Sequence, residues 1–156
     1  TSMARGDISR QHHRPAVLCD VLHVQQTDTE TDMPAPLTPP MQRMLFTAVA
    51  QAIEAKFNDA YSQEMCAGAM CNVRTLRALA RRGLLVEVAG VLESYRLTPE
   101  GWLAAAFFVE DLCRMHIRAA EDRLKSWPDS PGFKAISYLQ AGAAHQVLAM
   151  LATLRR

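Results

Sequence analysis

The residues best suited to chemistry in this chain are four arginines at helical spacing. Arg74, Arg77, Arg81 and Arg82 lie in the stretch "VRTLRALARR", which contains no acidic residue. The whole chain has a formal net charge of only +1, so this is a local excess of positive charge. Guanidinium groups form paired hydrogen bonds with carboxylate and phosphate oxygens and with the major-groove edge of guanine. The stretch therefore predicts contact with a negatively charged partner, either a nucleic acid or an acidic protein surface.

The spacing of these arginines predicts that residues 72–82 form a helix with two unlike sides. The apolar side consists of Val73, Leu76, Leu79 and Ala80. The opposite side carries Arg74, Ala78, Arg81 and Arg82, with Thr75 and Arg77 at its two flanks. Asn72 is a suitable N-cap, and Gly83 is a suitable residue to close the helix. We expect the apolar side to pack on preceding helices, which leaves the basic side to a partner.

Two helices are expected to precede this one and support it. The stretch "MQRMLFTAVAQAIEAKF", from Met41 to Phe57, places its apolar residues on one stripe and predicts an amphipathic helix. The stretch "SQEMCAGAM", residues 62–70, predicts a short second helix with Ser62 as its N-cap. Both are expected to cover the apolar side of the arginine helix.

A hairpin and two long helices are expected to follow. Residues 84–90 are rich in branched side chains and predict a strand, and residues 95–98 predict its antiparallel partner. Thr98 is a suitable N-cap for a helix that has Pro99 at its first position and continues without a breaker to residue 127. After "PDSPG", a final helix is expected from about Phe133 onwards.

The chain resembles winged helix-turn-helix proteins in its order of three short helices and a two-stranded hairpin, and in its sequence motifs "RRGLL" and "YRLTPEG". This broad class includes MarR-like and PadR-like transcription regulators of bacteria, plasmids and phages. The resemblance covers about Met41 to Ala106 and implies a mainly α fold in which helix 72–82 reads DNA and the hairpin is the wing. Two departures are that this helix is shorter than in typical MarR-like proteins, and that "AGAMCN" lacks the usual small polar capping sequence.

The resemblance and the arginine pattern together predict roles for individual residues. Base-facing roles are expected for Asn72, Arg74, Thr75 and Ala78, and phosphate contacts for Arg77, Arg81 and Arg82. Arg96 of the wing is expected to reach the neighbouring DNA backbone or minor groove, with Glu93 opposing that approach. The predicted function is sequence-specific binding of double-stranded DNA by a transcriptional regulator of the repressor type. A winged-helix module that binds an acidic protein, and an ordinary solvated helix face, stay open as alternatives.

The chain divides into three expected regions. Residues 1–40 contain the acidic "TDTETD" and the proline-rich "MPAPLTPP" and predict a flexible tail. Residues 41–101 form the winged helix-turn-helix domain, and residues 102–156 form a helical region for homodimerisation, which would suit DNA half-sites one turn apart. The expected dimer interface consists of Val109, Leu112, Ile117, Leu139, Val147, Met150 and Leu154. The alternative is that both long helices fold back on their own domain.

No metal ligand, cofactor or catalytic residue is expected. The cysteines are Cys19, Cys66, Cys71 and Cys113, and the absence of a signal-like segment or a long apolar run predicts reduced thiols in the cytoplasm. Cys113 and His116 are spaced as half of a zinc site, but small core side chains explain the pattern more simply. The spacing of Cys66 and Cys71 is unusual for metal ligands. A thiol switch there, with nearby arginines favouring the thiolate, stays open as an alternative.

Two further sequence features bear on ligands. Trp102 and the pair Phe107-Phe108 can line a pocket for a small-molecule effector of unknown identity, or can simply pack in the core. The chain has no glycine-rich phosphate loop, no nucleophile with recognisable partners and no spaced carboxylate pair. We therefore expect a binding protein and not an enzyme.

Overall fold

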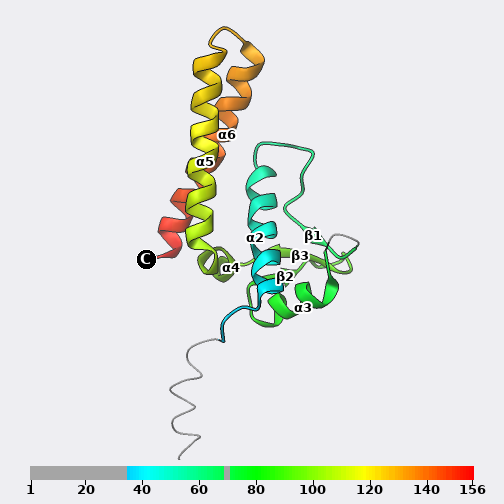
Figure 1. The fold of residues 1–156 in the computed structure, drawn as a ribbon. Coiled ribbons are helices and arrows are strands. Elements are labelled where there is room, and N and C mark those ends of the chain that lie inside the picture. Colours follow the sequence, from blue (N-terminus) through cyan, green and yellow to red (C-terminus); the bar gives the residue numbers. More distant parts are fainter. Residues whose placement is uncertain (1–34, 69–70) are drawn as a thin grey trace, which may run out of the picture. The chain divides into compact units, whose positions relative to one another are not determined.

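The computed structural model describes residues 35–68 and 71–156. The chain divides into two units, residues 1–36 and 37–156, and the helices and strands given below belong to the second. That unit is mainly helical, with a small antiparallel sheet (Figure 1). The predicted flexible tail lies outside the described residues except for residues 35–40, and the last two of these already belong to a helix.

Helix α2, Pro39–Glu54, confirms the first predicted amphipathic helix. It begins at Thr38, whose hydroxyl accepts a hydrogen bond from the Met41 amide at 3.4 Å, and two prolines occupy its first positions, where a missing amide hydrogen costs nothing. Its buried side is formed by Leu45, Ala48, Val49, Ala52 and Ile53. This side is the central part of the hydrophobic core.

The second predicted helix is wrong over residues 62–68, because this segment forms turns and a strand. Strand β1, Met65–Cys66, pairs with β3, Ser94–Leu97, and places Met65 opposite Tyr95. The Ser62 hydroxyl, expected to cap a helix, instead accepts a hydrogen bond from the Glu64 amide at 3.1 Å. The Gln51 side chain of α2 donates to the carbonyl oxygens of Ser62 and Glu64, at 2.8 and 2.9 Å. These tertiary bonds outweigh the local helical pattern.

Helix α3, Val73–Arg81, is the predicted arginine helix. The Asn72 side chain accepts a hydrogen bond from the Arg74 amide at 2.8 Å, which confirms the predicted N-cap. Gly83 follows the helix with a φ of 77°, and its amide donates to Ala80 while the Leu84 amide donates to Leu79. This pair of bonds is the Schellman arrangement, in which glycine is favoured because it adopts a positive φ without a steric penalty.

The predicted hairpin is confirmed and gains a third strand. Strand β2, Leu85–Glu87, pairs antiparallel with β3, and the strand order of the sheet is β1-β3-β2. The connection between β2 and β3 is longer than predicted because the chain already turns at Val88. Gly90 and Glu93 in this turn have positive φ angles of 80° and 56°.

The single helix predicted over residues 99–127 is wrong, because the structure divides it at Ala105. Helix α4, Pro99–Ala104, is capped by the Thr98 hydroxyl, which accepts a hydrogen bond from Gly101 at 3.0 Å. Helix α5, Ala106–Ser126, follows. Gly101 lies against the backbone of Leu84, and any Cβ atom at this position would overlap the Leu84 carbonyl oxygen. The glycine of "LTPEG" is therefore required for α4 to pack on the start of the hairpin.

The last helix, α6, Pro131–Leu154, packs beside α5 as an antiparallel partner (Figure 1). It begins two residues earlier than predicted, with Ser130 as its N-cap. Its buried residues Ala144, Val147 and Leu151 join the same core as α2, α3 and the sheet. Among the described residues, no helix combines the length and the apolar character that crossing a membrane requires.

Candidate nucleic-acid interface

Four of the eight residues predicted to contact DNA are exposed on α3 or at its N-cap. Leu76 and Leu79 are fully buried and fix the helix on the core, and therefore Arg74, Arg77 and Arg81 on the other side are exposed. Among the remaining predicted residues, Asn72 is exposed, whereas Thr75, Ala78 and Arg82 are partly buried. We call Arg74, Arg77 and Arg81 the arginine face.

One member of the arginine face already has an acidic partner. The Arg77 guanidinium donates to a carboxylate oxygen of Glu93 at 2.7 Å, and the two side chains are 53% and 36% exposed. Glu93 lies in the turn between β2 and β3, and its carbonyl oxygen accepts a hydrogen bond from the Ala67 amide beyond β1. The turn therefore places a negative charge beside α3. Because both side chains are well exposed, solvent screens this pair and a stronger anion can replace Glu93.

The eighth predicted DNA contact, Arg96, has a different acidic partner. Arg96 lies in β3 opposite Val86, and its guanidinium is 3.5 Å from a carboxylate oxygen of Glu64, immediately before β1. The structure thus connects Arg77 with the β2–β3 turn and Arg96 with the other edge of the sheet. The two ion pairs neutralise part of the positive charge that the sequence places around α3.

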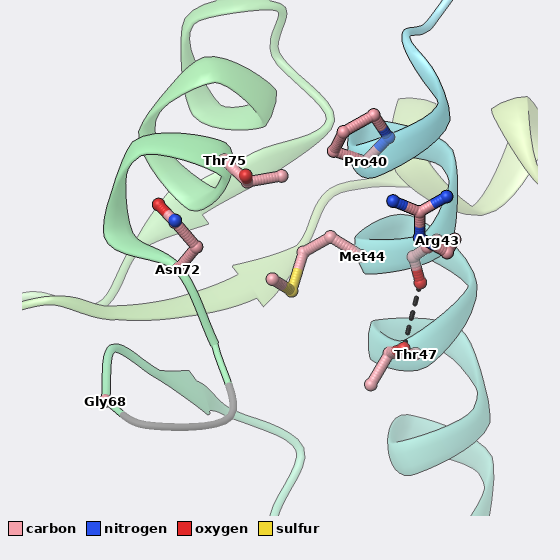
Figure 2. Close-up of a pocket in the computed structure, with 7 residues that line it drawn as sticks. All are labelled: Pro40, Arg43, Met44, Thr47, Gly68, Asn72 and Thr75. Atoms are coloured by element: carbon pink, nitrogen blue, oxygen red, sulfur yellow. Dashed lines mark hydrogen bonds between the residues drawn. The ribbon is translucent and has the colours of Figure 1, made fainter.

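A groove of about 410 Å³ lies between α2 and the start of α3 (Figure 2). It is lined by Pro40, Arg43, Met44, Thr47, Gly68, Asn72 and Thr75. Figure 2 shows Asn72 and Thr75 on the α3 side of this groove and Arg43 on the α2 side. The groove therefore joins two predicted base-facing residues with a cation from another helix.

Arg43 was missed by the sequence analysis. It is an exposed residue of α2, and its backbone carbonyl accepts a hydrogen bond from the Thr47 hydroxyl at 2.9 Å. A single arginine on the polar side of an amphipathic helix gives little local signal, because such residues usually only solvate the helix. Only the packing of α2 on α3 brings Arg43 to the same groove as Asn72 and Thr75.

Most of the residues predicted for a dimer interface pack within the chain itself. Val109 and Val147 are buried in the core, and Leu112, Ile117, Met150 and Leu154 are partly buried against it. Leu139 is different, because 59% of it is exposed. This placement favours the fold-back alternative for six of the seven residues and leaves Leu139 available to another surface.

Exposed large apolar side chains are frequent on α5, on α6 and between them. They include Phe107, Met115, Trp127, Phe133, Ile136, Tyr138 and Leu139. The sequence from Ala135 to Leu154 contains no Asp, Glu, Lys or Arg. The solvent-facing side of α6 along this length therefore has no carboxylate, ammonium or guanidinium group, and His145 is exposed there. We call the exposed residues Ile136, Tyr138 and Leu139 of α6 the apolar face.

The aromatic residues considered for an effector pocket have separate environments. Trp102 is buried in the core, and the Phe108 ring stacks on Phe46 of α2 with a centroid distance of 4.3 Å. Phe107 is instead 85% exposed. Trp102 and Phe108 therefore pack in the core, as the second of the two interpretations predicted.

The pKa values of Cys71 and Cys113 are raised, which is the opposite of what a thiol switch at Cys71 would require. Burial and the adjacent Cys66 thiol raise the pKa of Cys71, and burial raises the pKa of Cys113 in α5 to about 11. Cys66 is exposed in β1, with its sulfur 3.0 Å from the Ser94 hydroxyl. Within residues 35–68 and 71–156, no three side chains of His, Cys, Asp or Glu converge as metal ligands would.

Comparison with known proteins adds no further constraint. No protein-family model, curated protein or solved structure matches the chain. The functional argument therefore depends on the arginine face, the adjoining groove and the apolar face.

Proposed function

We propose that this protein binds double-stranded DNA through α3 and the groove beside it, as a dimeric transcriptional regulator of the winged helix-turn-helix class that represses by occupying its operator. The observation that carries the proposal is the arginine face, whose members project from a nine-residue helix held by two fully buried leucines. A rigid helix with exposed arginines matches the width and the charge of the DNA major groove.

The N-terminal end of α3 is the part that would read bases. Recognition helices contact base edges mainly through their first residues, which here are Asn72, Arg74 and Thr75. The N-cap bond uses only the side-chain oxygen of Asn72, which leaves its amide group to donate to a base. Arg81 at the far end of α3 and Arg43 across the groove, both exposed, would then contact phosphates.

The hairpin after α3 supports assignment to the winged class, and so does the β1-β3-β2 sheet. One feature departs from that class. Only residues 67–72 connect β1 with α3, and those of them that the structure describes are not helical. In the helix-turn-helix pair, α3 would then be the reading helix and α2, which packs directly on α3, would be its supporting helix. This arrangement makes the groove between α2 and α3 a natural extension of the reading surface.

The dimer in this proposal uses the apolar face of α6. Exposed apolar side chains are unfavourable in water and suit contact with an identical apolar face. Leu139 is the member of the predicted interface that lies there. Two copies joined in this way would present two α3 helices to one DNA duplex.

A second candidate function is docking on an acidic protein. Arg77 and Arg96 already bind carboxylates of Glu93 and Glu64, at 2.7 and 3.5 Å, so this surface accommodates carboxylate groups in the geometry that an acidic peptide would use. The two functions differ in one measurable property. A duplex offers many phosphates and gives a steep dependence on salt, whereas a short acidic peptide gives a shallow one.

The test is binding of random-sequence duplex DNA over a salt series. Wild type is compared with Arg74→Ala/Arg81→Ala and with the control Arg118→Ala/Arg156→Ala, which removes the same charge from exposed positions on α5 and after α6. We expect the salt slope to fall by about one for each phosphate contact that is lost, in the α3 variant alone. Absence of wild-type binding at low salt, or an equal loss in the control, would contradict the proposal. Binding to an acidic peptide in that case would favour the second candidate.

A further inference from the structure

A chain of polar side chains is enclosed between α5 and α6, away from the candidate interface. Ser137 and Gln140 of α6 are only 0% and 7% exposed. The Arg123 guanidinium of α5 donates to the Ser137 hydroxyl at 3.2 Å and to the Gln140 side-chain oxygen at 2.8 Å. The Gln140 side-chain nitrogen is in turn 2.8 Å from Nδ1 of His116.

The protonation state of His116 follows from the direction of these bonds. Arg123 can only donate, so the oxygen of the Gln140 amide must face it. The NH2 group of Gln140 then faces His116 and can only donate. Nδ1 of His116 must therefore accept, which means that the imidazole is neutral and carries its proton on Nε2.

The surroundings of His116 also favour the neutral ring. Phe57, just beyond α2, contacts the imidazole edge to face with a centroid distance of 5.2 Å. Burial lowers the pKa of His116, and the negative charge of Glu54 in α2 opposes this more weakly. On α5 itself, Cys113 lies one turn earlier, and its pKa is raised to about 11, so its thiol is uncharged. Arg123, also on α5, is hydrogen-bonded to Gln140, which in turn contacts His116. On α6, the sequence from Ala135 to Leu154 has no Asp, Glu, Lys or Arg.

We propose that the His116–Gln140–Arg123 chain is a proton-sensitive link between α5 and α6, in which the His116–Gln140 hydrogen bond exists only while His116 is neutral. Protonation of Nδ1 would set two donors against each other across 2.8 Å. Rotation of the Gln140 amide gives no relief, because its NH2 group would then face the donors of Arg123. A positively charged ring would also lose hydration in this partly buried site. The inference does not depend on DNA binding.

The direction of the pH effect is determined by the lowered pKa. In the unfolded chain His116 takes up its proton near the ordinary value of about 6.5, whereas the folded chain takes it up only at a lower pH. The unfolded state therefore binds more protons between the two values. The free energy of unfolding contributed by this group is complete above pH ~6.5 and falls as the pH decreases toward the folded pKa.

The first experiment measures urea unfolding of the full chain at pH 7.5 and at pH 5.5. The variants are His116→Gln, which keeps an acceptor for Gln140, and His145→Gln, which removes an exposed histidine from α6 as a control. We expect acidification to raise the unfolding equilibrium constant of wild type and His145→Gln more than that of His116→Gln, by up to tenfold for each unit between the two pKa values. Equal pH dependence in all three proteins would overturn the proposal.

A second experiment is designed to raise the pKa of His116 instead of lowering it. In Gln140→Glu, a carboxylate accepts from Arg123 and also from a protonated His116, so we expect the pKa of His116, followed by NMR, to rise above its wild-type value. An unchanged pKa of His116 in this variant would contradict the link.

The tautomer of His116 in wild type provides a third test, which needs no substitution. NMR at neutral pH should show the proton on Nε2, and a proton on Nδ1 would refute the bond direction on which the inference depends.

Discussion

Helices α3 and α6 both bury one side in the same core and leave the other side to solvent, but the exposed sides differ in kind. On α3 the exposed side carries three arginines, whereas α6 has no Asp, Glu, Lys or Arg from Ala135 to Leu154. The strongest interactions that α3 can add are electrostatic and suit a polyanion. Those that α6 can add are apolar and suit a surface like itself. In the proposed function, α3 provides the surface for DNA and α6 the surface for assembly.

The largest expected effect concerns the contribution to stability of a buried leucine in α3 and an exposed leucine in α6. Leu79→Ala in α3 should lower the free energy of unfolding by about 2–5 kcal/mol, because it leaves a cavity beneath the arginine face. Leu139→Ala in α6 removes the same atoms from an exposed position and should change the stability of the monomer by no more than about 0.5 kcal/mol. Chemical denaturation at low protein concentration gives both values. Similar losses in the two variants would show that the α6 side chain is also buried.

The second prediction concerns assembly through the apolar face. Ile136→Lys/Leu139→Lys places two like charges on each copy and should weaken dimerisation by roughly 30-fold or more, since central apolar contacts commonly contribute about 2 kcal/mol or more. Sedimentation equilibrium measures the dissociation constant. The matched control is Val86→Lys/Val91→Lys, which places the same charges on apolar side chains of β2 and its turn that are also about half exposed. Monomeric wild type, or equal weakening in the control, would remove the assembly role of α6.

The third prediction concerns base reading at the start of α3. Arg74→Ala should weaken binding to a selected DNA site about tenfold and should reduce the preference for that site over random DNA, because a base contact is lost together with its charge. Arg81→Ala should weaken binding to both kinds of DNA by similar factors, as expected for a phosphate contact. Fluorescence anisotropy at fixed salt measures both ratios. If Arg81→Ala changes the preference and Arg74→Ala does not, the assigned direction of α3 in the groove is reversed.

Features that depend on neighbouring residues could be predicted from the sequence. The caps at Asn72 and Thr98 involve bonds between residues two or three positions apart, and the β2–β3 hairpin pairs residues no more than twelve positions apart. The alternation of arginines and leucines along α3 likewise determines which side is buried. The composition of a short window therefore contains the information for these elements.

Features that depend on distant residues could not be predicted in the same way. Residues 62–68 have a plausible helical pattern, yet Gln51 and the pairing of Met65 with Tyr95 draw them into the sheet. Arg43 enters the candidate site only because α2 packs on α3. Glu93 was expected to oppose the approach of the wing to DNA, but its contact with Arg77, sixteen residues earlier in the chain, was not predicted. A window centred on either residue contains no sign of these partners.

The smallest expected effect concerns the Glu93 carboxylate, which lies beside Arg77 of the arginine face. Glu93→Gln keeps a hydrogen-bonding side chain beside Arg77 but removes the charge that repels phosphate, so duplex binding should become about two- to fivefold tighter, in line with the small net value of exposed ion pairs. The salt slope should also become slightly steeper, because Arg77 is released for phosphate. Glu121→Gln, at an exposed position of α5, is the control for loss of one negative charge and should have less effect. If Glu93→Gln instead weakens binding, the carboxylate does not compete with DNA but holds Arg77 in the orientation that DNA requires.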